Sequence, residues 1–119
     1  MACILFVDDD PFTLETYARM MSLTPHQALL ASDAATALQM LKRETVDLVV
    51  LDHRLQGDDG FQALRAIRDL PQGKEVPVVM VSAGHESLGE VALRAGAQAY
   101  RCKPLFLQEL LDLLEELTA

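Results

Sequence analysis

The strongest constraint on the fold is a regular alternation between short apolar runs and longer segments with helical periodicity. Five runs are apolar at nearly every position, which is typical of strands buried on both faces. They cover residues 4–7, 27–31, 48–51, 76–81 and 99–102. After each run, apolar side chains recur at the three- or four-residue spacing of one helix face. These helical segments lie around residues 14–21, 34–41, 61–67, 88–95 and 107–114.

Strict alternation of strand and helix predicts right-handed crossovers and a parallel sheet with helices on both faces. A chain of 119 residues is the size of one domain. We therefore expect an α/β fold, a single doubly wound domain over residues 1–119.

Composition excludes several classes of function. The net charge of -8 opposes binding to a nucleic-acid backbone, which requires a basic surface. No apolar run approaches the roughly 18 residues that span a bilayer, and the N-terminus lacks the basic segment of a secretory signal. Two cysteines do not form a disulfide framework. We expect a cytoplasmic protein that binds neither nucleic acid nor membrane.

Polar residues that could bind a ligand or take part in a reaction follow four of the five predicted strands. Asp8 and Asp9 follow the first, Asp52 the third, Ser82 the fourth and Lys103 the fifth. The C-terminal ends of parallel strands share one edge of a sheet, where α/β proteins bind their ligands. Each acid alone could be only a turn former or a helix cap. The combination predicts one site at this edge.

Clustered carboxylates need a cation. Two unit charges about 4 Å apart repel by roughly 4 kcal/mol at an effective dielectric of 20. Lys103 offsets one charge, and Mg²⁺ is the divalent ion that best suits a few carboxylates and phosphate oxygens. Zn²⁺ prefers His or Cys ligands, which this edge lacks. Asp10 stands before Pro11 and is better explained as a helix cap than as a ligand.

In order and spacing, these residues resemble the receiver domain of two-component response regulators. The resemblance covers nearly the whole chain and rests on five short motifs. They are residues 7–11, 51–60, 81–83, 95–97 and 103–104. It implies a flavodoxin-like sheet with strand order 2-1-3-4-5, flanked by five helices.

The resemblance also implies roles for individual residues. Asp52 would be the phosphoacceptor, and Lys103 would pair with the phosphoryl group. Mg²⁺ would be held by Asp9 directly, by Asp8 mainly through water, by Asp52, and by the backbone carbonyl of Arg54. Ser82 would be the switch hydroxyl, and Tyr100 the switch aromatic.

The implied function is a phosphorylation-switched signalling module rather than a turnover enzyme. A sensor histidine kinase or a phosphotransfer protein would donate the phosphoryl group. The face formed by the fourth helix, fifth strand and fifth helix would then control a partner protein or an attached output domain, or form a homodimer. Phe106 stands where a helix cap is usual, and it either contacts such a partner or packs against Leu110. Leu113 and Leu117 favour a partner surface.

Three other classes remain as alternatives. A receiver-like interaction module that is never phosphorylated would usually have lost part of the acidic site, which this chain keeps. A dehalogenase-like phosphatase needs a second aspartate two residues after the first, where this chain has Arg54. A flavin-binding module needs a phosphate loop after the first strand, where the run of Asp8, Asp9 and Asp10 would repel phosphate.

Overall fold

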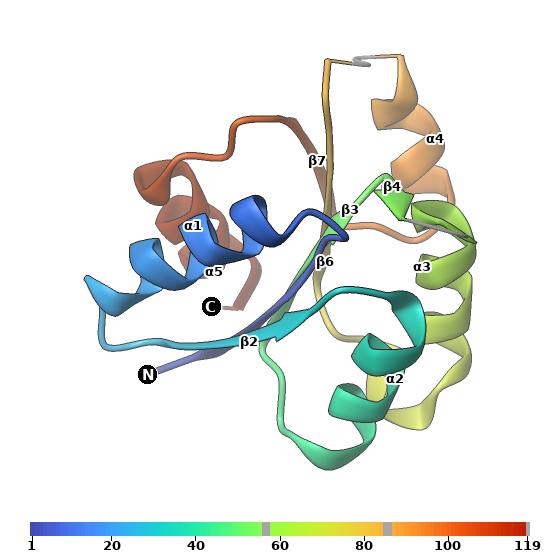
Figure 1. Ribbon diagram of the computed structural model, residues 1–119. Coiled ribbons are helices and arrows are strands. Elements are labelled where there is room, and N and C mark those ends of the chain that lie inside the picture. The colour runs from blue at the N-terminus through green and yellow to red at the C-terminus, as the bar shows by residue number, and fades with distance from the viewer. Residues whose placement is uncertain (56–57, 85–86, 119) are drawn as a thin grey trace.

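The fold is a five-stranded parallel sheet between two layers of helices, seen in a computed structural model that describes residues 1–55, 58–84 and 87–118 (Figure 1). Positions 56 and 57 of the 51–60 motif lie outside the described residues. The strands are β1 (Cys3–Val7), β2 (Gln27–Ala31), β3 (Leu48–Asp52), β6 (Val78–Ser82) and β7 (Ala99–Cys102). Their order is β2-β1-β3-β6-β7, with every neighbouring pair parallel. Since β6 and β7 are the fourth and fifth strands of this sheet, the predicted order is confirmed.

Helices cover both faces of the sheet. Figure 1 shows α1 and α5 on one side and α2, α3 and α4 on the other. Their bounds are α1 Pro11–Ser22, α2 Ala34–Arg43, α3 Gly60–Asp69, α4 Leu88–Arg94 and α5 Leu107–Thr118. A short 3₁₀ turn, η1 (Pro71–Gly73), follows α3. None of the described helices is long and apolar enough to cross a membrane.

One small element was not predicted. β4 (Arg54–Leu55) pairs antiparallel with β5 (Asp58–Asp59) directly after β3. Two-residue strands carry no periodicity, so the apolar pattern gives no signal for them. This ladder fixes the backbone that follows Asp52.

The core divides into two clusters, one on each face of the sheet. Along β1, Leu5 and Val7 pack into the cluster under α2, α3 and α4, whereas Ile4 and Phe6 pack into the one under α1 and α5. Successive strand side chains point to opposite faces. A strand covered by helices on both faces is therefore apolar at every position, as the sequence showed.

Helix caps follow the sequence expectation. The Asp10 carboxylate accepts a hydrogen bond from the Phe12 N–H at 3.1 Å and one from the Thr13 hydroxyl at 2.8 Å. Asp33 caps α2 through the Thr36 N–H at 2.7 Å. Asp10 therefore starts α1 and is not part of the acidic cluster described below.

One expectation for α5 is wrong, because Leu113 is only 2% exposed and belongs to the core. Leu117 is partly buried against the same cluster and also lines a groove between α4, β7 and α5. Helical periodicity locates an apolar face but does not give its width. Phe106, immediately before α5, is 67% exposed, so it does not pack away against Leu110. The exposed apolar side chains near this face are Phe106 and, on α4, Val91 and Leu93.

Arg68 of α3 joins three segments on the side of the sheet that carries α2, α3 and α4. Its guanidinium donates to the carbonyls of Gly73 (2.9 Å) and Val76 (2.6 Å), which precede β6. It also donates to the Gly96 carbonyl, at 2.7 and 3.2 Å, and to the Gln98 side chain at 2.8 Å. Gln98 in turn accepts from the Val78 N–H at 2.7 Å. One planar cation thereby satisfies the carbonyls of two loops.

Replacement of Arg68 by lysine should destabilise the protein by about 2 kcal/mol, because a single ammonium cannot make these divergent hydrogen bonds. Urea unfolding measures the loss. The control is Arg65→Lys on the exposed side of the same helix, which should change stability by less than about 0.5 kcal/mol. Equal effects of the two substitutions would contradict the role assigned to Arg68.

Candidate functional site

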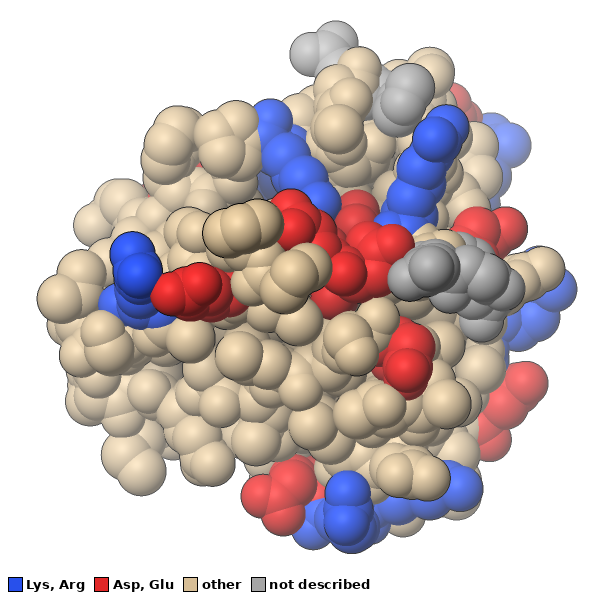
Figure 2. All heavy atoms as spheres, in the orientation of Figure 1, with Lys and Arg blue, Asp and Glu red and all other residues tan. Residues whose placement is uncertain are grey.

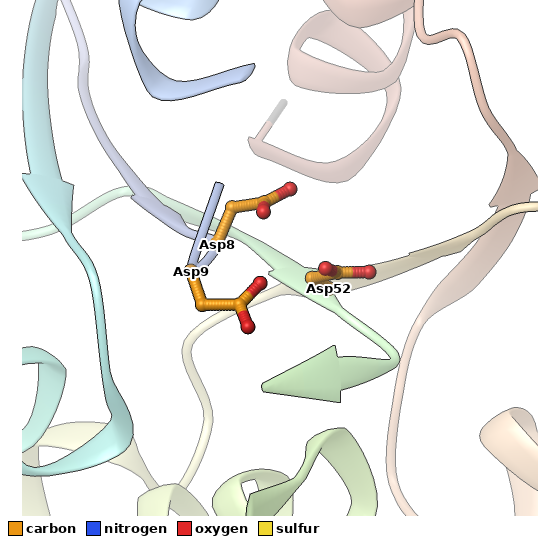
Figure 3. Close-up of side chains that lie close together, drawn as sticks. All are labelled: Asp8, Asp9 and Asp52. Carbon is orange, nitrogen blue, oxygen red and sulfur yellow. The ribbon is translucent and has the colours of Figure 1, made fainter. Parts of the chain in front are cut away.

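Three carboxylates meet at the C-terminal edge of the sheet (Figure 3). Asp8 and Asp9 follow β1, and Asp52 ends β3. One oxygen from each lies within 4.8 Å of the other two. Asp8 and Asp52 are buried and Asp9 is exposed. Figure 2 shows acidic side chains gathered over the ends of β1 and β3, with basic side chains on two sides.

Lys103, just after β7, supplies positive charge to this cluster. Its ammonium lies 2.8 Å from Asp8 Oδ2 and 3.3 Å from Asp52 Oδ2. Burial alone would lower the pKa of this ammonium. The hydrogen bond to Asp8 and the charges of Asp52 and Asp8 outweigh that effect and raise the pKa. Lys103 is therefore a charged bridge between the first and third strands of the sheet.

Asp52 is the perturbed carboxyl of the site. Burial, followed by repulsion from Asp8, raises its pKa to about 6, against opposing effects of Lys103 and of the Arg54 backbone N–H. A single ammonium therefore does not fully compensate the clustered charge. A carboxyl shifted in this way by burial and a neighbouring charge, beside a pocket, is typical of functional sites.

The local backbone holds these side chains in place. A Cβ at position 60 would overlap the Asp52 carbonyl oxygen and lie 2.9 Å from His53 Cα, so α3 can start here only with glycine. The Gly60 N–H donates to the His53 carbonyl at 2.7 Å. On β1, Asp8 Oδ1 accepts from the Asp10 N–H at 2.9 Å, which leaves Asp8 Oδ2 for Lys103.

Ser82 places an unsatisfied hydroxyl in the site. It ends β6 and is 1% exposed. Among the described residues, its Oγ is the one fully buried side-chain oxygen or nitrogen without a hydrogen-bond partner. Such a group costs about 1–3 kcal/mol unless something binds it. Its carbonyl, by contrast, accepts from the Lys103 N–H at 2.7 Å and the Gly84 N–H at 3.0 Å.

A pocket of about 210 Å³ joins these groups, and we call it the acceptor pocket. Its lining consists of Asp52, His53, Arg54, Ser82, Ala83 and Lys103. His53 is half-buried, and its ring stands edge-to-face against Phe61 with ring centroids 5.5 Å apart. A carboxylate, an ammonium and a hydroxyl without a hydrogen-bond partner thus line the same small volume.

The donor set suits a hard divalent cation. Carboxylate oxygens from Asp8, Asp9 and Asp52 are the ligands that Mg²⁺ prefers, and a divalent charge would relieve the repulsion that raises the Asp52 pKa. Arg54 has an exposed side chain and directs its N–H to Asp52. The role of its carbonyl as a ligand stays a prediction.

Tyr100 lies away from the acceptor pocket. It is half-buried on β7, and its ring runs along the first turn of α4, where a Cβ at Gly89 would be 3.4 Å from Tyr100 Cδ2. A groove of about 330 Å³ between α4, β7 and α5 includes Gly89, Leu93 and Tyr100 in its lining. Tyr100 therefore belongs to the surface that faces a partner in the sequence-based interpretation.

Sequence reasoning missed Tyr17. Within the helical segment around residues 14–21, the apolar residues Leu14, Ala18 and Met21 fit one helix face, whereas the structure buries Leu14, Tyr17 and Met21. Positions 14, 17 and 21 also fit helical spacing, so the signal was present but ambiguous by one residue. Tyr17 stacks on Phe6 with centroids 4.4 Å apart.

Comparison with known proteins agrees with this geometry. PilH of Pseudomonas aeruginosa is 30% identical, and the alignment covers 100% of this chain and 99% of PilH. The response regulator MprA of Mycobacterium leprae is 37% identical over 91% of this chain. The match spans 47% of MprA, so this chain corresponds to about half of that relative.

Solved structures show the same fold. The receiver domain of NtrX from Brucella abortus is 34% identical, with 97% of each chain covered and a TM-score of 0.87. The receiver domain of a sensor histidine kinase from Pseudomonas aeruginosa is 29% identical, with 98% and 97% covered and a TM-score of 0.87. That structure holds a magnesium ion in its active-site cleft.

The family described as the response regulator receiver domain matches residues 4–115, which is nearly the whole chain. The acidic edge and the parallel five-stranded sheet therefore have a common explanation: this chain belongs to the receiver domain family of two-component response regulators.

Proposed function

We propose that Asp52 accepts a phosphoryl group and that the modified chain signals through its α4–β7–α5 face. One observation carries the proposal. The buried Asp52 carboxylate lines a single small pocket with the partnerless Ser82 hydroxyl and the Lys103 ammonium. A phosphoryl group on Asp52 would bring three acceptor oxygens to these two donors.

The chemical step needs little beyond positioning. An Asp52 oxygen attacks phosphorus, the bond from phosphorus to the donor atom breaks, and the donor leaves with that electron pair. The product is an acyl phosphate on Asp52. Lys103 lies 3.3 Å from the attacking carboxylate. During transfer, the Lys103 ammonium would pair with the phosphoryl oxygens, to which Ser82 would donate a hydrogen bond.

Asp8, Asp9, Asp52 and the Arg54 carbonyl would hold Mg²⁺ beside this pocket. When bound, the ion supplies positive charge that neutralises the phosphoryl oxygens during transfer. Asp8 and Lys103 already form a buried pair at 2.8 Å. This pair keeps the ammonium close to Asp52 before the phosphoryl group arrives.

The response would start at Ser82. When its hydroxyl turns to the phosphoryl group, it would vacate space that Tyr100 could fill from β7, and the Tyr100 ring would leave its place beside Gly89 of α4. This is a two-state element biased by a local change in charge. Phe106, Val91 and Leu93 are the exposed apolar side chains available to a partner there.

Membership of the receiver domain family supports the choice of partners. A phosphohistidine on a sensor kinase or a phosphotransfer protein would donate the phosphoryl group. A partner protein, an attached output domain or a second copy of the chain would receive the signal on the α4–β7–α5 face. If Asp52 is never phosphorylated, the same face would make the chain a constitutive interaction module.

Incubation with Mg²⁺ and acetyl phosphate should add one phosphoryl group, measured by intact mass. Asp52→Asn should abolish the gain, since the amide cannot attack phosphorus. Asp10→Asn is the matched control because asparagine keeps the cap of α1 and position 10 lies outside the acidic cluster. A folded wild-type protein that binds Mg²⁺ but gains no mass would favour the interaction module.

The raised pKa of Asp52, about 6, predicts a pH-dependent stability. Because the folded state holds this proton more tightly than the unfolded chain, its contribution to the free energy of unfolding falls as pH rises through about 4 to 6. In chelator, Asp52→Asn should therefore be about 1–3 kcal/mol more stable than wild type at about pH 7.5, and nearly equal to it at about pH 4, where Asp52 is protonated in the folded state. Urea unfolding at both pH values measures this. An Asn variant less stable than wild type at the higher pH would contradict the charge imbalance.

A further inference from the structure

A second pocket adjoins the acceptor pocket on the side of α1. It has a volume of about 220 Å³, and its lining consists of Thr13, Thr16, Tyr17, Lys103, Pro104 and Leu105. Lys103 lines both pockets. The Lys103 side chain therefore lies between the second pocket and the acceptor pocket. A phosphodonor could place its phosphoryl group on one side of Lys103, next to Asp52, and the rest of the molecule on the other side.

Tyr17 gives this pocket an unused hydrogen-bond donor. The residue is 4% exposed, and its ring is held by the stack on Phe6. Among the described residues, its hydroxyl has no hydrogen-bond partner, yet it is not fully enclosed as Ser82 Oγ is. Tyr17 is part of the lining of this pocket. Burial and the charges of Asp8 and Asp52 raise the pKa of this phenol, so it stays protonated.

The other two hydroxyls of the lining already donate hydrogen bonds within the protein. Thr13 donates to Asp10 Oδ2 at 2.8 Å, and Thr16 donates to the Phe12 carbonyl at 2.9 Å. Pro104 and Leu105 complete an apolar wall. The pocket therefore offers one neutral donor and one cationic side chain within an otherwise apolar surface, which suits a small apolar group that ends in a carboxyl oxygen.

We propose that this pocket receives the acyl half of a small acyl phosphate, and that the Tyr17 hydroxyl donates a hydrogen bond to the carboxylate that leaves. The proposal rests on the proposed function of Asp52 and assigns a leaving-group pocket and a hydrogen-bond donor to the same reaction. Tyr17 then acts on the leaving group rather than on the phosphoryl group, which Ser82 and Lys103 meet in the acceptor pocket.

The step is balanced without any further reactant. An Asp52 oxygen forms a bond to phosphorus, and the bond between phosphorus and the acyl oxygen breaks. The electron pair stays on that oxygen, and a carboxylate is released without taking up a proton. A hydrogen bond to an oxygen that gains charge is stronger in the transition state than in the bound donor, so it raises the rate of transfer.

Two phosphodonors separate this role from a structural one. Acetyl phosphate releases a carboxylate, whereas phosphoramidate has no acyl group and releases ammonia. Tyr17→Phe should lower the rate constant for phosphorylation by acetyl phosphate about tenfold, the effect of losing about 1.4 kcal/mol of transition-state stabilisation. The rate with phosphoramidate should stay within about twofold of wild type. Ser22→Ala, which removes an exposed hydroxyl at the other end of α1, should change neither rate.

Equal slowing with both donors would overturn the proposal, since Tyr17 would then act only by supporting Lys103. Unchanged rates with both would also overturn it. No phosphorylation of wild type by either donor would instead overturn the proposed function of Asp52. The comparison between donors is made within one variant, so a modest loss of stability in Tyr17→Phe does not affect it.

Binding to the wild-type protein gives a readout that needs no chemical step. Acetonylphosphonate, in which a methylene replaces the bridging oxygen of acetyl phosphate, should shift the amide NMR signals of Thr13, Thr16 and Leu105. It should also shift those of Ala83 and Lys103 in the acceptor pocket. Shifts confined to the acceptor pocket would show that the acyl half binds elsewhere and would overturn the assignment.

Discussion

The Lys103 ammonium, 2.8 Å from Asp8 and 3.3 Å from Asp52, holds together an edge of the sheet that carries more negative than positive charge. Asp9 adds a third carboxylate. Burial and the negative charge of Asp8 raise the pKa of Asp52 to about 6. A divalent cation bound to these carboxylates would supply positive charge, and a related receiver domain holds a magnesium ion in its active-site cleft. The folded chain thus keeps an unfavourable interaction that a bound cation would relieve.

Much of this site could be predicted from the sequence because parallel strands impose their own geometry. Five apolar runs followed by helical segments leave few arrangements, and the C-terminal ends of the strands then share one edge. Asp8, Asp52, Ser82 and Lys103 are distant along the chain, but each directly follows or ends a strand of the sheet. Asp10 could be separated from the cluster because Pro11 marks the start of a helix.

Other features depend on contacts that no local pattern contains. Arg68 binds the carbonyl of Gly96, 28 residues away, and nothing in the helical spacing of α3 distinguishes it from Arg65. Tyr17 and Ala18 fit the periodicity of α1 about equally well, and packing against Phe6 decides between them. Leu113 shows the same limit in α5, where the sheet covers a wider stripe than expected. The β4–β5 ladder is too short to have a period of its own.

The backbone of Ser82 sets how a signal can leave the site. Its carbonyl is bound by the N–H groups of Lys103 and Gly84, and it ends a strand paired on both sides. Only the side-chain torsion of Ser82 remains free to change without breaking main-chain hydrogen bonds. Information about Asp52 would therefore pass to the surface as a rotation of one hydroxyl and a rearrangement of neighbouring rings, while the sheet itself stays rigid.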